Sequence, residues 1–207
     1  MELNCALVIL SGGLDSVTTL YWARERFRTV EAFSLDYGQR HHVELEMAAW
    51  HCRRMEIPHH RMNLPLDQLL RSNLLKGQGE VPESVATVKD GDGVPRTYVP
   101  FRNGILLSLG AGLAESRDID FLITGFNRID SPDYPDTTAD FSLAMEAAIN
   151  EGTGYRKRGK RFAILTPLSH LSKQEIVEMD LKLGVDYSRT VSCYRGSEEP
   201  CLHCPSC

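Results

Sequence analysis

Short apolar runs alternate with longer amphipathic stretches along the first third of the chain. The apolar run at residues 5–10 predicts a buried strand, and residues 15–26, beyond a glycine corner, predict a helix. Residues 30–35 predict a second strand, and residues 41–55 carry apolar positions at helical spacing, which indicates a second helix. A short third strand is expected just before Leu64.

The same alternation continues to the C-terminal region. Helices are predicted over residues 101–115, 138–149 and 173–183, and strands over residues 118–125 and 162–165. Strands that alternate with helices favour a parallel sheet covered by helices on both faces. The expected fold class is therefore α/β, with a doubly wound, Rossmann-like parallel sheet.

One stretch breaks the pattern. Residues 74–96 are rich in glycine, proline and charge and show no period, which predicts a long functional loop. The whole chain of 207 residues is close to the size of one domain.

Composition and charge argue against several classes of function. The chain is 42% hydrophobic and 25% charged, as in ordinary globular proteins. Its net charge of -5 argues against stable nucleic-acid binding, which depends on clustered Lys and Arg, and favours a small substrate. No apolar run approaches the roughly 20 residues of a membrane helix, and the N-terminal region lacks the pattern of a secretory signal. We expect a cytoplasmic protein with no membrane partner.

The corner between the first predicted strand and helix reads SGGLDS. Gly12 and Gly13 allow a tight turn with backbone N–H groups pointing at an anion, Ser11 and Ser16 add hydroxyl donors, and the helix N-terminus adds attraction. The lysine of a Walker A loop is missing, so γ-phosphate transfer is not expected. Asp15 would repel a phosphate unless Mg²⁺ bridged the two groups. The alternative is a plain helix start capped by Ser11 or Asp15.

The C-terminal region carries a C-x7-C-x2-C-x2-C array. Its cysteines are Cys193, Cys201, Cys204 and Cys207. Four thiolates at this spacing complete the tetrahedral shell of structural Zn²⁺, and disulfides are the weaker alternative in a cytoplasmic chain. His203 is interpreted as a bystander, and Cys5 and Cys52 as small core residues.

The SGGLDS corner resembles the pyrophosphate loop of the PP-loop ATP pyrophosphatases, enzymes with an adenine nucleotide alpha hydrolase-like fold that adenylate a carboxylate or carbonyl and release pyrophosphate. The resemblance implies a PP-loop domain over residues 1–185 and a small zinc-binding appendage over residues 186–207. The nucleotide-binding residues that it implies are Leu10, Ser11, Gly12, Gly13, Leu14, Asp15, Ser16, Val17, Thr18, Thr19 and Leu20.

Further segments occur in a specific order: DYGQRH followed by Glu44, YVPFRN, GFN with DYPD, TPL with SKQEI, and the cysteine array. Together they resemble the QueC family of 7-cyano-7-deazaguanine synthases over nearly the whole chain. The resemblance implies ATP-dependent conversion of 7-carboxy-7-deazaguanine and ammonia into the nitrile, through an adenylated carboxylate and then an adenylated amide, in queuosine biosynthesis. It implies Zn²⁺ on the four array cysteines.

The candidate catalytic residues are Asp15, Ser16, Lys173, Arg102 and His41. Lys173 and Arg102 are expected to contact phosphate, and the alternative for each is a solvated surface charge. His41 is a candidate base for ammonium, because imidazole titrates near neutrality, and polar capping of the next helix explains it almost as well.

The candidate substrate-binding residues are Gln39, Arg40, Asn103, Asp133, Tyr134 and Asp136. Gln39 and Arg40 are expected to position either the substrate or the nucleotide. Asp133 and Asp136 would present carboxylates to the N–H edge of a guanine-like base, and a turn-forming role is equally consistent with SPDYPD.

The chain departs from the family pattern at the acceptor side. Thr137 and Thr138 replace a usual cysteine and arginine, and Phe101 replaces a usual glycine. Three alternatives therefore stay open: adenylation of another carboxylate on a protein, peptide or metabolite, a tRNA-modifying enzyme, and a non-catalytic adenine-nucleotide sensor. The expected partners are the deazapurine, ammonia and a second copy of the chain in a homodimer.

Overall fold

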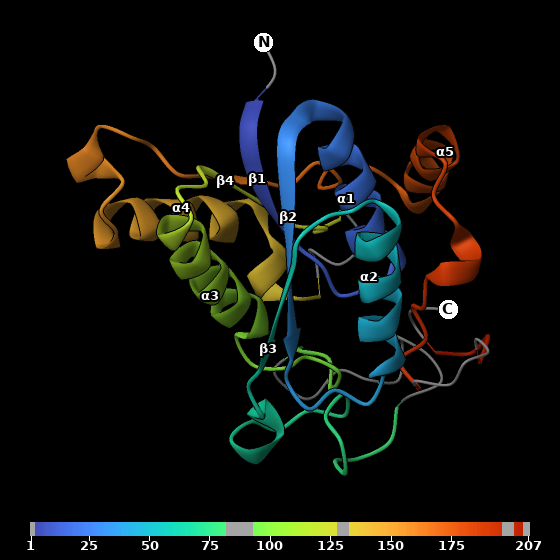
Figure 1. Ribbon diagram of the computed structural model, residues 1–207. Coiled ribbons are helices and arrows are strands. Elements are labelled where there is room, and N and C mark those ends of the chain that lie inside the picture. The colour runs from blue at the N-terminus through green and yellow to red at the C-terminus, as the bar shows by residue number, and fades with distance from the viewer. Residues whose placement is uncertain (1–2, 82–92, 128–132, 196–200, 205–207) are drawn as a thin grey trace.

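A five-stranded, fully parallel sheet forms the centre of the molecule (Figure 1). The structure is a computed structural model that describes residues 3–81, 93–127, 133–195 and 201–204. The strand order is β3-β2-β1-β4-β5. The strands are β1 (Leu3–Ile9), β2 (Phe27–Asp36), β3 (His59–Asn63), β4 (Phe121–Ile123) and β5 (Ala163–Leu165). This arrangement confirms the predicted fold class.

Helices cover both faces of the sheet, with α1, α2 and α5 on one side and α3 and α4 on the other (Figure 1). They are α1 (Leu14–Arg26), α2 (Val43–Arg54), α3 (Arg102–Ser116), α4 (Ala139–Gly152) and α5 (Lys173–Leu183). Short 3-10 helices join them, namely η1 (Leu66–Gln68), η3 (Pro135–Thr137), η4 (Arg156–Arg158) and η5 (Tyr187–Arg189). Among the described residues, no helix has the length and apolar character to cross a membrane.

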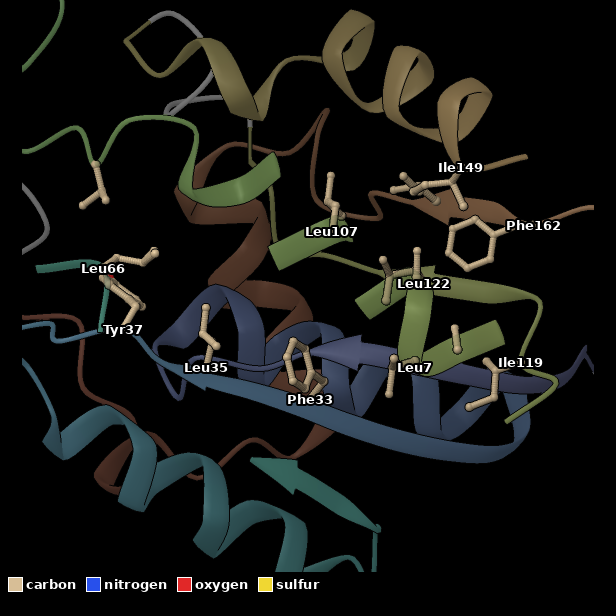
Figure 2. Packing of buried hydrophobic residues seen from close by; sticks show 14 of the residues in the cluster. Leu7, Phe33, Leu35, Tyr37, Leu66, Leu107, Ile119, Leu122, Ile149 and Phe162 are labelled. Atoms are coloured by element: carbon tan, nitrogen blue, oxygen red, sulfur yellow. The ribbon is translucent and has the colours of Figure 1, made fainter. Parts of the chain in front are cut away.

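The side-chain alternation of β1 divides the core into two layers. Leu7 faces α3 and α4 and packs with Leu107, Leu122 and Phe162 (Figure 2), whereas Val8 faces α1 and α2 on the opposite side. In both layers these side chains are almost completely buried. A strand buried on both faces reads as the continuous apolar run seen in the sequence.

The predicted elements all exist, with their ends shifted by a few residues. The largest difference is at the fourth strand, which pairs only over Phe121–Ile123 instead of the predicted residues 118–125. The described part of the predicted loop at 74–96 has no helix or strand, and an isolated bridge joins its Leu75 to Gln39. Residues 82–92 of that loop lie outside the described residues.

All five strands end at one edge of the sheet, because they are parallel. The chain enters at the central strand β1, builds β2 and β3 on one side, and then crosses to build β4 and β5 on the other. The topological switch therefore lies between β1 and β4, where ligands bind in open α/β sheets. The segment after β1 is the SGGLDS corner.

Candidate functional site

The SGGLDS corner forms a tight loop whose backbone N–H groups converge on two hydroxyls. The N–H groups of Ser11 and Gly12 donate to Ser16 Oγ at 3.2 and 3.1 Å, and the Gly13 N–H donates to Ser11 Oγ at 3.3 Å. Gly13 is the N-cap of α1 and receives no side-chain cap, so the capping alternative of the sequence does not describe this corner. Converging N–H groups at a helix N-terminus are suited to an anion.

Glycine is required at position 12 by a close approach. Gly12 has a φ of 98°, and a Cβ built there would lie 1.8 Å from the backbone oxygen of Glu44 in α2. The loop can turn next to α2 only because this residue has no side chain.

Asp15 makes the contacts that link the loop to the switch point. Lys173 Nζ, at the first residue of α5, lies 2.9 and 2.7 Å from the two Asp15 carboxylate oxygens. Asn127, just after β4, donates its amide N–H to the same carboxylate at 3.0 Å. The Lys173 side chain is 46% exposed, so the cation is accessible to a bound anion, yet it is paired and is not the solvated charge of the alternative interpretation.

The remaining residues of the predicted nucleotide segment lie beneath the loop. Thr18 and Thr19 direct their hydroxyls to backbone carbonyls of α1, those of Leu14 and Ser16, at 2.8 Å each. Other members of the segment are buried in the core, namely Leu10, Val17 and Leu20. Ser11, Gly13, Leu14 and Asp15 are therefore the more exposed residues of the loop, whereas Gly12 and Ser16 are buried and the residues on either side support it.

A buried polar pair lies on the other side of the loop. His41 Nε2 is 3.4 Å from a carboxylate oxygen of Glu44, and both side chains are almost completely buried. Burial and the nearby Arg102 charge lower the pKa of His41 to about 4, and burial raises the pKa of Glu44 well above its usual value. A Cβ on Gly13 would lie 3.5 Å from Glu44 Oε1, so this pair adjoins the loop directly. At neutral pH the imidazole is uncharged, and a pKa this low makes it a poor base for ammonium, contrary to the expectation from the sequence.

Arg102, whose charge acts on both members of this pair, also lines a small cavity of about 50 Å³. Its guanidinium donates to the Tyr37 hydroxyl at 3.2 Å. Although burial opposes the charge, the Tyr37 contact and the Asp136 carboxylate raise the pKa of Arg102, which keeps it cationic. The cavity is lined by Leu74, Thr97, Tyr98, Val99, Arg102, Tyr134, Asp136, Thr137 and Tyr194. An aromatic cavity with one cation suits a planar ring that carries a carboxylate.

The candidate substrate residues fall into two groups. Tyr134 and Asp136 line the cavity: the Tyr134 hydroxyl lies 2.7 Å from Thr97 Oγ1, and Asp136 accepts the backbone N–H of the buried Asn103 at 2.9 Å. Asp133, just before Tyr134, is partly buried. Asp136 is thus partly occupied in capping α3, in addition to facing the cavity.

Gln39 and Arg40 do not line this cavity. Gln39 Oε1 accepts the Tyr37 N–H at 2.8 Å, which closes the turn after β2. The Arg40 guanidinium donates to the backbone carbonyls of Leu75 and Gln78 at 3.2 and 2.9 Å, so it holds the start of the long loop.

The departures at Thr137 and Thr138 have clear local roles. Thr138 is the N-cap of α4 and accepts the Phe141 N–H at 3.1 Å, while the Thr137 hydroxyl donates to the Tyr134 carbonyl at 2.8 Å. Phe101 has a φ of 54°, in the left-handed region that glycine adopts without strain. Its ring compensates by packing edge-on against Phe141.

The described array cysteines form a metal-compatible cluster. The sulfur atoms of Cys193, Cys201 and Cys204 all lie within 4.8 Å of one another. The backbone N–H groups of His203 and Cys204 lower the pKa of Cys201 to about 6, which favours the thiolate that binds metal. Cys207 lies outside the described residues. Cys52 is buried in the core layer that contains Val8, and the half-buried Cys5 packs against the layer that contains Leu7, so both are core residues as predicted.

Sequence reasoning assigned no role to two residues of this region. Glu44 and Asn127 each contact the nucleotide loop or its carboxylate, although they are distant from it in sequence. Asn127 is the last residue of the quoted segment GFN, and Glu44 follows the segment DYGQRH. The sequence alone does not show which residues these two side chains contact.

The chain matches a known family over most of its length. The family described as "Queuosine biosynthesis protein QueC" matches residues 5–207. Proteins named 7-cyano-7-deazaguanine synthase are similar: that of Psychrobacter cryohalolentis is 39% identical over 98% of this chain and 82% of its own, and that of Pseudomonas fluorescens is 39% identical over 100% and 92%. That of Aquifex aeolicus is 38% identical over 97% and 92%.

Solved structures share the fold at low identity. The U34-tRNA thiolase NcsA from Methanococcus maripaludis, solved with its 4Fe–4S cluster, has a TM-score of 0.52 and 16% identity over 90% of this chain and 59% of its own. A 4-thiouridine synthetase in complex with RNA and bound ATP has a TM-score of 0.53 and 17% identity, and this chain spans 47% of it. These likenesses concern the fold alone.

Proposed function

The chain belongs to the QueC family of queuosine biosynthesis proteins, and we propose that it converts 7-carboxy-7-deazaguanine and ammonia into 7-cyano-7-deazaguanine using ATP. The observation that carries this proposal is the convergence of the SGGLDS loop, the Asp15–Lys173 pair and the Arg102 cavity at one edge of the sheet.

The nucleotide would bind with its phosphates against the loop. The N–H groups of Ser11 to Gly13 would exchange the serine hydroxyls for phosphate oxygens, and Lys173 would turn from Asp15 toward the pyrophosphate. A single partly exposed carboxylate fits Mg²⁺, which takes few protein ligands and completes its shell with water and phosphate. When bound, Mg²⁺ would neutralise charge on the departing pyrophosphate.

The acceptor would occupy the cavity, with its carboxylate directed at Arg102 and its ring beside Tyr98 and Tyr134. The tyrosine rings lie 6.3 Å apart at 47°, and a cavity of about 50 Å³ has to widen by movement of these walls to admit a bicyclic base. Two other polar wall residues, Thr97 and Asp136, would meet the N–H edge of the ring.

The chemistry follows in balanced steps. An acceptor carboxylate oxygen attacks the α-phosphorus of ATP and displaces pyrophosphate. Ammonia then attacks the acyl carbon and displaces AMP, and the amide forms with loss of a proton. The amide oxygen attacks the α-phosphorus of a second ATP and displaces a second pyrophosphate, and loss of AMP and of both N–H protons leaves the nitrile. Free ammonia, rather than ammonium, would make the attack, because burial and the Arg102 charge lower the pKa of His41 to about 4 and leave it too weak a base to deprotonate ammonium.

The cysteine cluster would hold a structural Zn²⁺ with Cys207 as the fourth ligand. Thiolate ligands in a closed shell suit zinc, and cysteines that serve as ligands fit a cytoplasmic protein, where disulfides are rare. Residues 186–207 would then form a zinc-binding appendage on a PP-loop domain of residues 1–185. Metal analysis of the purified protein should find one zinc per chain, and Cys193→Ser should lose it. Purified protein without zinc would refute this assignment.

The partners follow from the same proposal. The net charge of -5 supports a small-molecule acceptor over stable nucleic-acid binding. A homodimer remains part of the proposal, and sedimentation equilibrium of the purified protein would distinguish it from a monomer.

The test is pyrophosphate release from ATP with Mg²⁺ and ammonium, with and without 7-carboxy-7-deazaguanine, while mass spectrometry follows the product. Release that depends on this substrate and yields the nitrile is the expected result. Lys173→Ala should abolish it, whereas Lys182→Ala, a matched change on the exposed face of α5, should not.

One observation favours a second candidate function. Thr137, one of the three residues that depart from the family pattern, lines the acceptor cavity. Protein that binds ATP but is not stimulated by 7-carboxy-7-deazaguanine would point to adenylation of a different carboxylate. ATP binding without pyrophosphate release for any acceptor would point to a nucleotide sensor.

A further inference from the structure

The chain after α5 is anchored on α2 before it returns to the loop. The imidazole of His51 lies 2.9 Å, through Nε2, from the backbone carbonyl of Arg189 in η5. The Arg189 guanidinium stacks over the ring of Trp50 at 5.5 Å from its centroid. These contacts fix where the following residues run.

The next two residues lie directly against the nucleotide loop. The Val191 N–H donates to the Gly12 carbonyl at 3.4 Å, and a Cβ on Gly13 would lie 3.4 Å from the Val191 carbonyl. The Ser192 hydroxyl accepts the Leu14 N–H at 3.4 Å. This N–H belongs to the first turn of α1, where backbone donors have no partner inside the helix. The Ser192 hydroxyl thus lies among the backbone donors of the candidate phosphate site.

Three consecutive side chains then reach three different parts of the molecule. Ser192 meets the loop, Cys193 is buried in the sulfur cluster, and Tyr194 lines the acceptor cavity with its ring 6.1 Å from that of His41. The sulfur cluster is also packed against Val81 from the long loop. A metal that fixes Cys193 therefore fixes its neighbours on both sides.

We propose that Ser192 is a further ATP-binding residue, whose hydroxyl donates to a phosphate oxygen, and that metal ligation at Cys193 holds it in place. A hydroxyl is able to accept the Leu14 N–H and donate to phosphate at the same time. The metal then sets the affinity for ATP as well as the stability of the appendage. This inference rests on the proposed nucleotide site.

The first test measures ATP binding by calorimetry with Mg²⁺ and no acceptor. Ser192→Ala should weaken ATP binding about tenfold, the size of one hydrogen bond to a charged group, with unchanged zinc content and melting temperature. Ser192→Thr, which keeps the hydroxyl, should restore most of the affinity. Ser188→Ala is the matched control, because Ser188 is an exposed serine in the same segment that bonds to Asp186. Affinity within twofold of the wild type for Ser192→Ala, or loss of its zinc, would overturn the proposal.

The second test asks whether the metal acts through Ser192. Removing the metal with a chelator should weaken ATP binding about tenfold in the wild type and less than threefold further in Ser192→Ala, with helix content monitored by circular dichroism. Equal losses in both proteins would show that Ser192 does not transmit the effect. Wild-type protein that binds no ATP would refute the nucleotide site itself, whereas ATP binding without nitrile formation would refute only the choice of acceptor.

Discussion

The close approach at Gly12 gives a quantitative prediction for Gly12→Ala. The new Cβ would lie 1.8 Å from the Glu44 backbone oxygen, 2.7 Å from its carbon and 3.0 Å from the Ala48 nitrogen. Because all three are backbone atoms, α2 and the loop would have to separate by roughly 1.5 Å to restore an ordinary carbon–oxygen contact of about 3.3 Å. A side chain at a φ of 98° adds strain of its own.

The expected cost combines these two effects. Strain of about 1 to 2 kcal/mol and overpacking of about 1 to 3 kcal/mol sum to about 2 to 5 kcal/mol of unfolding free energy. For a chain of this size, that lowers the melting temperature by about 4 to 20 °C. Gly13→Ala is the matched control, since Gly13 has ordinary angles (φ -75°, ψ 161°) and its Cβ would meet its nearest atom at 3.4 Å.

Urea unfolding and thermal melts of the two variants and the wild type would measure the difference. Any change in the unfolded chain is the same for both substitutions and cancels in the comparison. Gly13→Ala should stay within about 1 kcal/mol of the wild type. Equal stabilities of Gly12→Ala and Gly13→Ala would refute the argument that the loop excludes a side chain at position 12.

Three further predictions follow from single contacts. Asp15→Ala should lower pyrophosphate release at least about 100-fold while changing the melting temperature little, because its ion pair with Lys173 is partly exposed and such pairs contribute about 0 to 1 kcal/mol; substantial turnover would remove Asp15 from the mechanism. Burial raises the pKa of Asp180 from 3.8 to about 6, so the folded chain holds this proton more tightly, and the resulting stability is present below about pH 4 and lost as the pH rises through 6. Urea titrations should therefore show the wild type losing on the order of 3 kcal/mol relative to Asp180→Asn between pH 4 and 7, and parallel profiles would contradict the assignment. Thr138→Ala should cost about 1 kcal/mol through loss of the α4 cap, measured by thermal melts, with Thr138→Ser close to the wild type; an equal loss in both variants would exclude the hydroxyl as the cause.

The sheet and its helices were predictable because their signals are local. The run at residues 5–10 is apolar on both faces because β1 is central, and the helical spacing of residues 173–183 matches α5, including the Ser172–Glu175 capping box. The strand predicted at residues 118–125 is too long. The sequence pattern shows which residues are apolar, but it does not show over how many residues the strand pairs with its neighbours.

The candidate site was predictable where one segment carries several of its groups. The loop at Ser11 to Ser16 and the cysteine spacing each place chemistry within a few residues, so spacing alone identifies them. Gln39 and Arg40 were harder to interpret, because a polar side chain near the catalytic edge serves equally well to hold a loop, and their contacts go to the backbone of neighbouring segments.

The sequence by itself determined the fold class and located the candidate anion-binding corner and the candidate metal-binding array, because each depends on residue type and short spacing. Only the tertiary structure decided that Lys173 reaches Asp15 across 158 residues and that Ser192 reaches Leu14 across 178. It also decided that Arg102 joins His41 and Glu44 beside the loop. These contacts depend on which strands are neighbours and where their loops end, and the strand order is set by the packing of the whole chain.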